Sequence, residues 1–264
     1  MTLTNPLSSL PIKPNTSYGT QVVRWKVGGF CLLLAGFIAC AEANGLCPGE
    51  IEKATKLRQR IVTEWPLRAS SDEVSQYVQN LALYLSERYN NSNSPSIPWR
   101  VTVVRNLAPN AFSIGGGNIF VNEGAISFAQ SEAELAAILA HEMAHELAGH
   151  FCEASRSSVS NSLFDIFSTP DTQQYKANIG SVTQTIDPAK EREADHLALS
   201  ILWSAGFNPR AMLDVARRLP SGLSGHLPDA SRIKSLEQSM ANAPPLIPGS
   251  SVGFRKIKQI LSNE

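Results

Sequence analysis

Two histidines and a glutamate in the middle of the chain have the types and the spacing of a catalytic metal site. The segment HEMAH spans residues 141–145, and on a helix His141 and His145, four residues apart, share one face. Their neutral imidazoles can therefore reach a single metal ion, and Zn²⁺ suits such ligands. Glu142 lies one position along, where a carboxylate can take a proton from metal-bound water. The segment predicts one zinc ion per chain, with Glu142 as the catalytic base.

The surrounding residues favour a buried metal helix over a surface helix with two ordinary histidines. The run ELAAILAHEMAHELAGHF is rich in Ala and Leu, and Ser131 can cap a helix that continues to about Phe151. Histidines on a buried helix need partners for their ring nitrogens. A shared metal ion is the simplest such partner.

A catalytic zinc needs a third protein ligand, and a later segment with three carboxylates offers one. The sequence EREAD, residues 191–195, begins a helix predicted over residues 188–205. Glu191 and Asp195 are one turn apart on the same face, so Glu191 can bind zinc while Asp195 accepts a hydrogen bond from a ligating histidine. Glu193 points about 160° away from Glu191 and fits a solvated position. The alternative is that these acids are only the favourable charges of a helix start.

Hydrophobic periodicity predicts an α+β domain, mostly helical, with a small sheet of about three strands beside the metal helix. The predicted helices span residues 49–66, 72–89, 131–151, 188–205, 209–219 and 229–241, and the predicted strands span residues 99–105, 111–114 and 118–121. Residues 153–186 are rich in Ser, Thr, Gln and Asn, and we interpret them as a mobile excursion.

The first 45 residues are interpreted as an export signal, with a signal peptide over residues 1–43. A positively charged flank precedes an apolar run at residues 27–39, which has the length of a signal-peptide core and is short for a spanning helix. Small residues predict cleavage before Asn44, whereas the sequence FIAC resembles a lipobox that would make Cys40 a lipidated N-terminus. An uncleaved anchor is the third alternative. The chain is therefore expected in the cell envelope, in the periplasm or as an outer-membrane lipoprotein held at the membrane.

Two cysteines, Cys47 and Cys152, remain in the exported chain and are candidates for a disulfide. Outside the cytoplasm thiols often pair. This bond would join the N-terminal segment to the end of the metal helix, and the alternative is two unpaired, buried thiols.

The charge balance argues against a nucleic-acid partner. Lys and Arg together number 23, as do Asp and Glu. No basic cluster is dense enough to follow a phosphate backbone.

Four segments, in order, resemble the zinc peptidase family that includes the CAAX prenyl endoprotease, HtpX and bacterial periplasmic relatives. They are NAF with GGNIFVNEGAI, then SEAELAAILAHEMAHELAGH, then EREADHLALSILWSAGFNPRAM, then HLPDASRI. The resemblance covers about residues 50–242 and implies a zincin-like peptidase domain there, with residues 243–264 as a tail packed on it. It also implies Glu191 as the third zinc ligand, Asp195 as the residue behind a ligand, and a structural place for His150.

The same resemblance implies roles for His226 and Arg232. In related sites a His or Arg at this place stabilises the oxyanion, or the His occupies the open metal position in a resting state. The chain departs mildly from the family pattern here, because Leu227 stands where the family has proline.

The segment at residues 118–122 resembles the family's edge strand beside the active-site helix. An extended peptide could add to such an edge by backbone hydrogen bonds. Asn118, Ile119 and Phe120 are therefore expected to bind substrate, and Asn110 to orient the local backbone. The alternative is an ordinary strand of the sheet.

Together these features predict a zinc metalloendopeptidase that cuts protein or peptide substrates of the envelope in protein quality control. One alternative keeps the fold but has low activity: a chaperone-like peptidase that binds misfolded outer-membrane proteins, with its site plugged by His226 or by residues 153–186. Another alternative is a non-enzymatic envelope interaction protein. The presence of three candidate ligands and a base argues against the latter.

Overall fold

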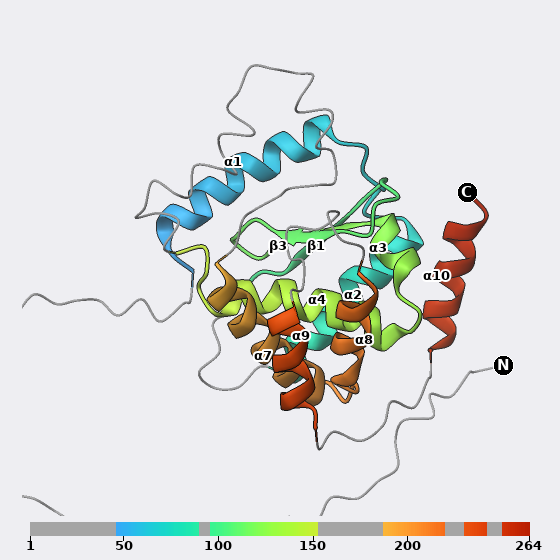
Figure 1. Ribbon diagram of the computed structural model, residues 1–264. Coiled ribbons are helices and arrows are strands. Elements are labelled where there is room, and N and C mark those ends of the chain that lie inside the picture. Colours follow the sequence, from blue (N-terminus) through green and yellow to red (C-terminus); the bar gives the residue numbers. More distant parts are fainter. Residues whose placement is uncertain (1–45, 90–95, 153–186, 220–229, 242–249) are drawn as a thin grey trace, which may run out of the picture. The chain divides into compact units, whose positions relative to one another are not determined.

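The fold is α+β, as the sequence predicts, and helices make up most of it (Figure 1). The computed structural model describes residues 46–89, 96–152, 187–219, 230–241 and 250–264, so the predicted signal peptide and the segment 153–186 lie outside the described residues. The helices in these ranges are α1 (Pro48–Glu64), α2 (Glu73–Tyr89), α3 (Glu123–Phe128), α4 (Glu132–Leu147), α7 (Pro188–Ser204), α8 (Arg210–Arg218), α9 (Ala230–Ser239) and α10 (Val252–Ser262). The strands there are β1 (Arg100–Val104), β2 (Ala111–Ser113) and β3 (Asn118–Asn122). Within the described part of the chain, no helix combines the length and the apolar character that a membrane crossing requires.

β3 is the central strand of the sheet, because it pairs with a strand on each side. The strand order is β1-β3-β2, with β1 parallel and β2 antiparallel to β3. A tight hairpin joins β2 to β3 through residues 115–117, three glycines that all have positive φ. The prediction that residues 118–122 form an edge strand is therefore wrong. The edge strand that lies against α4 is β2.

The two faces of the sheet bury side chains against different helices, because successive strand residues point to opposite faces. On one face, Phe112 and Phe120 stack with their ring centroids 5.3 Å apart and meet Trp65, just after α1, edge-on. On the other face, Ile119 and Val121 join the core formed with α2 and α4. Figure 1 accordingly shows α1 on one side of the sheet and α2 with α4 on the other. Complete burial of each such apolar side chain contributes about 1.5–3 kcal/mol.

The bounds of α4 follow from local chemistry at both ends. The Ser131 side chain accepts a hydrogen bond from the backbone N–H of Glu134 at 3.2 Å, which caps the first turn. The helix ends at Leu147, four residues before the predicted end at about residue 151. Gly149, with a φ of +68°, turns the chain into a Schellman motif in which the N–H of His150 donates to the carbonyl of His145. The helix stops there because glycine adopts this left-handed conformation readily.

α7 packs along α4 and brings the EREAD segment to the metal helix. The Asp187 side chain caps α7 by accepting from the N–H of Ala189 at 2.7 Å, and a proline occupies the first turn. Ala194 and Ala198 are completely buried. Such small side chains let two helices approach closely enough for Glu191 to reach the histidines of α4.

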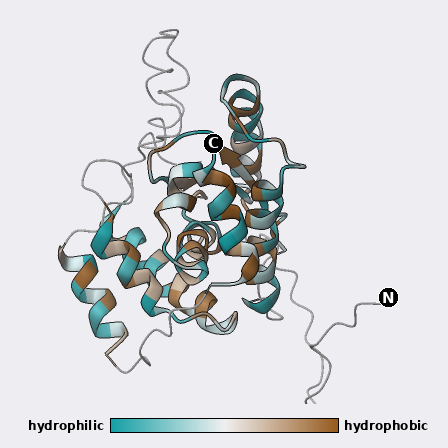
Figure 2. Ribbon diagram, turned by 90° about the vertical axis from the view of Figure 1, so that its right-hand side faces the viewer, coloured by the Kyte–Doolittle hydropathy of each residue, from teal (hydrophilic) through white to brown (hydrophobic). Residues whose placement is uncertain are grey.

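The C-terminal helix α10 packs on α2 and α3. Its apolar face buries Phe254 and Ile257. Lys258 donates hydrogen bonds to backbone carbonyls at the end of α3, among them that of Ala129 at 2.9 Å. Figure 2 shows hydrophobic and hydrophilic residues on different sides of the helices, the pattern of amphipathic helices around a shared core.

Candidate active site

Three side chains from α4 and α7 bring their ligand atoms together in the interior. The Nε2 atoms of His141 and His145 are 3.2 Å apart. Glu191 places Oε2 3.4 Å from the His141 nitrogen and Oε1 3.4 Å from the His145 nitrogen. All three residues are buried. The two histidines come from one face of α4, and Glu191 comes from the first turn of α7, as their spacing predicts.

This arrangement fits a tetrahedral zinc ion. Ligand atoms around zinc at about 2.0–2.1 Å are separated by about 3.3–3.4 Å along the edges of the tetrahedron. The separation of the two histidine nitrogens, 3.2 Å, is slightly shorter than this edge, and each nitrogen lies 3.4 Å from a different oxygen of the Glu191 carboxylate. Two imidazoles and one carboxylate are also the donor set of many catalytic zinc sites, which keep their fourth position for water or substrate. His141, His145 and Glu191 are therefore the residues that would hold the ion.

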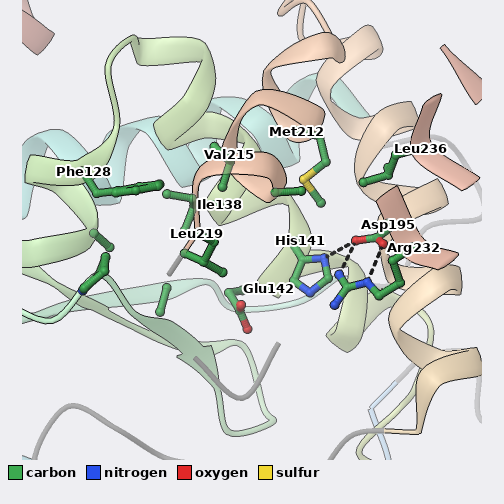
Figure 3. A pocket seen from close by; sticks show the side chains of 14 residues that line it. Phe128, Ile138, His141, Glu142, Asp195, Met212, Val215, Leu219, Arg232 and Leu236 are labelled. Carbon is green, nitrogen blue, oxygen red and sulfur yellow. Dashed lines mark hydrogen bonds and ion pairs between the residues drawn. The ribbon is translucent and has the colours of Figure 1, made fainter. Parts of the chain in front are cut away.

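Asp195 and Arg232 lie behind the first of these histidines (Figure 3). The Nδ1 atom of His141 is 3.1 Å from an Asp195 carboxylate oxygen. Arg232 donates to both oxygens of Asp195, at 2.9 and 2.7 Å, and a third guanidinium nitrogen is 2.7 Å from Glu191. The structure thus places Asp195 where the sequence predicts it, and it directs the Arg232 guanidinium at two carboxylates of α7.

These charges shift the pKa values of the metal-free site. Burial alone would lower the pKa of His141, but the carboxylates of Asp195 and Glu191 raise it to about 10. Burial alone would raise the pKa of Asp195, but His141 and Arg232 hold it below its usual value. A metal ion that binds His141 must therefore displace a proton from the ring.

The second histidine, His145, has another histidine beside its Nδ1 atom instead of a carboxylate. His145 Nδ1 lies 2.8 Å from His150 Nδ1, and His150 Nε2 lies 3.3 Å from a Glu193 carboxylate oxygen. Burial lowers the pKa of His150, which favours its neutral form. The Glu193 side chain is 65% exposed, in agreement with its expected solvated position, and its carboxylate nevertheless meets this ring.

Glu142 is buried beside His141, and the edge strand holds its carboxylate. The backbone N–H of Ser113 in β2 donates to one Glu142 oxygen at 2.9 Å. Figure 3 shows Glu142 near His141 among the residues that line the pocket. One carboxylate oxygen is thereby anchored while the group remains in the pocket next to the candidate metal ligands.

Sequence reasoning missed another buried carboxylate on α4, that of Glu146. It accepts hydrogen bonds from the Ser113 hydroxyl and from the N–H of Gly117, the latter at 3.1 Å. Burial raises the pKa of Glu146 to about 8, the neighbouring Glu50 adds to this, and the two donors oppose it. The sequence does carry a signal for the burial of Glu146, because it lies one turn after Glu142 on a helix otherwise rich in Ala and Leu.

A largely apolar pocket opens beside His141 and Glu142 (Figure 3). It contains about 570 Å³ of empty space, including its open mouth. Its apolar walls come from α3, α4, α8, α9 and the residue that follows α8, through Phe128, Ile138, Met212, Val215, Leu219 and Leu236. A pocket of this character accepts an apolar side chain of a ligand.

The predicted substrate-binding residues of β3 do not line this pocket. Ile119 and Phe120 are completely buried in the two cores on either side of the sheet. The Asn118 amide donates to the carbonyl of Gly115 at 2.9 Å and so closes the hairpin. Asn110, just before β2, accepts a backbone hydrogen bond from β3 through its carbonyl. The other two predicted positions, His226 and Cys40, lie outside the described residues.

Cys47 and Cys152 form a disulfide with an S–S distance of 2.02 Å. The bond links the residue before α1 to the segment just after α4. It therefore joins the helix that covers one face of the sheet to the end of the metal helix on the other face.

Comparisons with known proteins agree with this site. The family model described as peptidase family M48 matches residues 70–240. A similar relative is the mitochondrial metalloendopeptidase OMA1 of Schizosaccharomyces pombe, 30% identical over 168 residues that make up 58% of this chain and 50% of the relative. The beta-barrel assembly-enhancing proteases of Escherichia coli K12 and Yersinia pestis are each 26% identical, over 69% and 81% of this chain and 42% and 49% of those proteins. The chain thus spans half or less of the length of these curated relatives. Since the matched residues make up more than half of the chain, it belongs to peptidase family M48, and its candidate zinc site is His141, His145 and Glu191.

Proposed function

We propose that the chain is a zinc-dependent endopeptidase that hydrolyses peptide bonds in proteins of the bacterial cell envelope, as part of protein quality control. The observation that supports it most strongly is the convergence of His141, His145 and Glu191, with ligand atoms 3.2–3.4 Å apart, beside the Glu142 carboxylate. The names of the relatives, a beta-barrel assembly-enhancing protease and a mitochondrial metalloendopeptidase, support proteolysis and, for the former, a link to beta-barrel assembly.

The proposed chemistry is base-assisted attack of water on the scissile carbonyl. When bound, zinc supplies an acidified water and polarises the carbonyl oxygen. Glu142 takes the proton from this water on a carboxylate oxygen and passes it to the leaving amine. The N–H of Ser113 holds the other Glu142 oxygen, so the base starts in one orientation. His141 and His145 would hold the ion through Nε2, while Asp195 orients the ring of His141 through Nδ1.

Strand β2 is the edge to which an extended substrate would add. Backbone hydrogen bonds from Ile114 to Asn118 and from Asn122 to Asn110 pair the even-numbered positions of this hairpin with β3. The backbone groups of Ala111 and Ser113 consequently point to the other side. The N–H of Ser113 donates to Glu142 there, so the backbone groups of Ala111 are those with which a substrate would pair. A peptide that follows this edge would lie across the candidate zinc site and would place alternate side chains toward the pocket.

The apolar pocket would select a large apolar side chain next to the scissile bond. Phe128 forms one wall of the pocket, and Arg218 contacts both the ring and the backbone of Phe128. The guanidinium carbon of Arg218 lies 4.6 Å from the centroid of the Phe128 ring and a guanidinium nitrogen lies 3.5 Å from the Phe128 carbonyl oxygen. The same side chain is paired with Glu134 of α4.

The proposed location is the envelope, with residues 1–43 as the signal peptide, residues 50–242 as the peptidase domain and Cys40 as the alternative lipid attachment site. The Cys47–Cys152 disulfide supports an oxidising compartment. Protein substrates, among them misfolded outer-membrane proteins, are the proposed partners. His226 is proposed to act at the open metal position.

The test combines zinc stoichiometry with casein cleavage for the wild type, Glu191→Ala, Glu142→Gln and the control Glu87→Gln, a change of an exposed carboxylate on α2. We expect one zinc per chain in the wild type, weakened zinc binding in Glu191→Ala, and zinc without activity in Glu142→Gln. The control should match the wild type. A wild type without zinc would overturn the proposal, and zinc without cleavage would favour the low-activity, chaperone-like alternative.

A further inference from the structure

Three side chains form a continuous row from the candidate metal site to the protein surface. His145 Nε2 faces the other two ligands, at 3.2 Å from His141 and 3.4 Å from Glu191. Its other nitrogen, Nδ1, is 2.8 Å from Nδ1 of His150. Beyond His150, its Nε2 is 3.3 Å from the exposed carboxylate of Glu193.

This row has one consistent assignment of protons when His145 binds zinc through Nε2. The lone pair of that nitrogen is then used for the metal, so the ring proton of His145 is on Nδ1. That N–H then donates to His150 Nδ1, 2.8 Å away, which must be unprotonated. The proton of a neutral His150 is then on Nε2, where the Glu193 carboxylate accepts it.

Three features of the fold hold His150 in this position. The Schellman motif at the end of α4 ties its backbone N–H to the carbonyl of His145 at 3.0 Å, and this motif needs the positive φ of Gly149. Two residues later, Cys152 is covalently joined to Cys47. His150 itself is 9% exposed, so its ring has little freedom to turn away.

We propose that His150 is a positioning residue for the zinc ligand His145: it fixes the tautomer and the plane of that ring by accepting its Nδ1 proton. The inference rests on the proposed zinc-dependent function. It gives the two histidine ligands different supports, a carboxylate behind His141 and a neutral imidazole behind His145. Partners of metal ligands in other proteins commonly change metal affinity by about 10–100-fold when they are removed.

The experiment measures the zinc affinity of the full, oxidised chain by competition with a chelator. His150→Phe removes the acceptor and keeps a ring of similar size. His150→Asn places a side-chain oxygen where Nδ1 was and should rescue binding. His196→Phe is the matched control, because His196 is an exposed histidine of α7 that contacts Ser235 and Ser239 of α9. Thermal unfolding of each metal-free protein shows whether the fold is intact.

We expect His150→Phe to bind zinc about 10–100-fold more weakly, while His150→Asn and the His196 control stay within about threefold of the wild type. Equal affinity of His150→Phe and the wild type would overturn this inference and leave the proposed function intact. A wild type that binds no zinc would overturn both.

A second measurement does not depend on the folding of any variant. Ring ¹⁵N spectra of the zinc-bound wild type should show one histidine with its proton on Nδ1 and its Nε2 bound to metal, and His150 with its proton on Nε2. A His150 protonated on Nδ1 could not accept from His145 and would contradict the proposal.

Discussion

Replacement of Arg232 by glutamine should strongly destabilise the metal-free protein. The guanidinium makes contacts of 2.7–2.9 Å with Asp195 and Glu191, and all three side chains are 4–6% exposed. Without Arg232, two buried carboxylates would face one cation, His141. Removal of one partner from a buried ion pair costs about 3–5 kcal/mol, and because glutamine keeps one donor we expect about 3 kcal/mol here.

The size of this effect follows from solvent exclusion, which a surface pair lacks. Arg217 and Glu237 form an ion pair at 2.6 Å with side chains 47% and 45% exposed. Water screens such a pair, so Arg217→Gln should cost less than about 1 kcal/mol. This substitution is the matched control, since it also replaces an ion-paired arginine by glutamine.

The assay is thermal and urea unfolding of both variants in the presence of a metal chelator. A loss of about 3 kcal/mol in a domain of this size lowers the unfolding temperature by roughly 6–12 °C. Zinc brings a second cation to Glu191, so saturating zinc should stabilise Arg232→Gln more than it stabilises the wild type. If Arg232 acted only as an oxyanion donor, kcat would fall by about 10²–10³ and metal-free stability would not change. An unfolding temperature for Arg232→Gln equal to that of Arg217→Gln would refute our reasoning.

Three further predictions concern the surroundings of the site. The Cys47–Cys152 bond spans 105 residues, so its reduction should lower the free energy of unfolding by up to about 4.7 kcal/mol, measured by urea unfolding with and without reductant; unchanged stability would contradict it. The folded pKa of Glu146, about 8, lies above its usual value, so its contribution to stability is full below pH 4.5 and is lost as the pH rises through 8. Glu146→Gln should therefore flatten urea midpoints measured from pH 5 to 9, and an unaltered slope would count against a protonated Glu146. Arg218→Met should loosen Phe128 and so reduce the selectivity for peptides with a large rather than a small apolar side chain by roughly tenfold, through KM rather than kcat. Cleavage of peptide pairs that differ only in this side chain measures the selectivity. An unchanged selectivity would mean that contacts other than those of Arg218 hold Phe128 in place.

Local signals in the sequence were sufficient to predict the ligand-bearing elements. A serine cap and an Ala- and Leu-rich run predicted α4, and the helical spacing predicted that His141 and His145 share a face. The EREAD segment predicted Glu191 and Asp195 on one face of α7, and the structure places both beside His141. The end of α4 was predicted four residues too late, because Gly149 was not recognised as the residue that turns the chain.

Features set by contacts between distant segments were not predictable in the same way. The strand pattern of residues 118–122 is the same for a central and an edge strand, so only the pairing of β1 and β2 shows which one it is. The six-residue helix α3 is too short for a periodic signal, although Phe128 in it lines the pocket.

The sequence does not show which residues contact the buried polar groups of α4. A helix that buries two histidines and three glutamates must find a partner for each of them, since an unsatisfied polar group in the interior costs about 1–3 kcal/mol. The sequence therefore shows that partners must exist, but their identity depends on packing. Glu142 and Glu146 share Ser113 of the edge strand, and the two histidines are supported by residues from separate segments. Because these partners come from β2, from α7 and from the turn after α4, a change in the packing of β2 acts on the base, and a change in the packing of α7 or of that turn acts on a ligand.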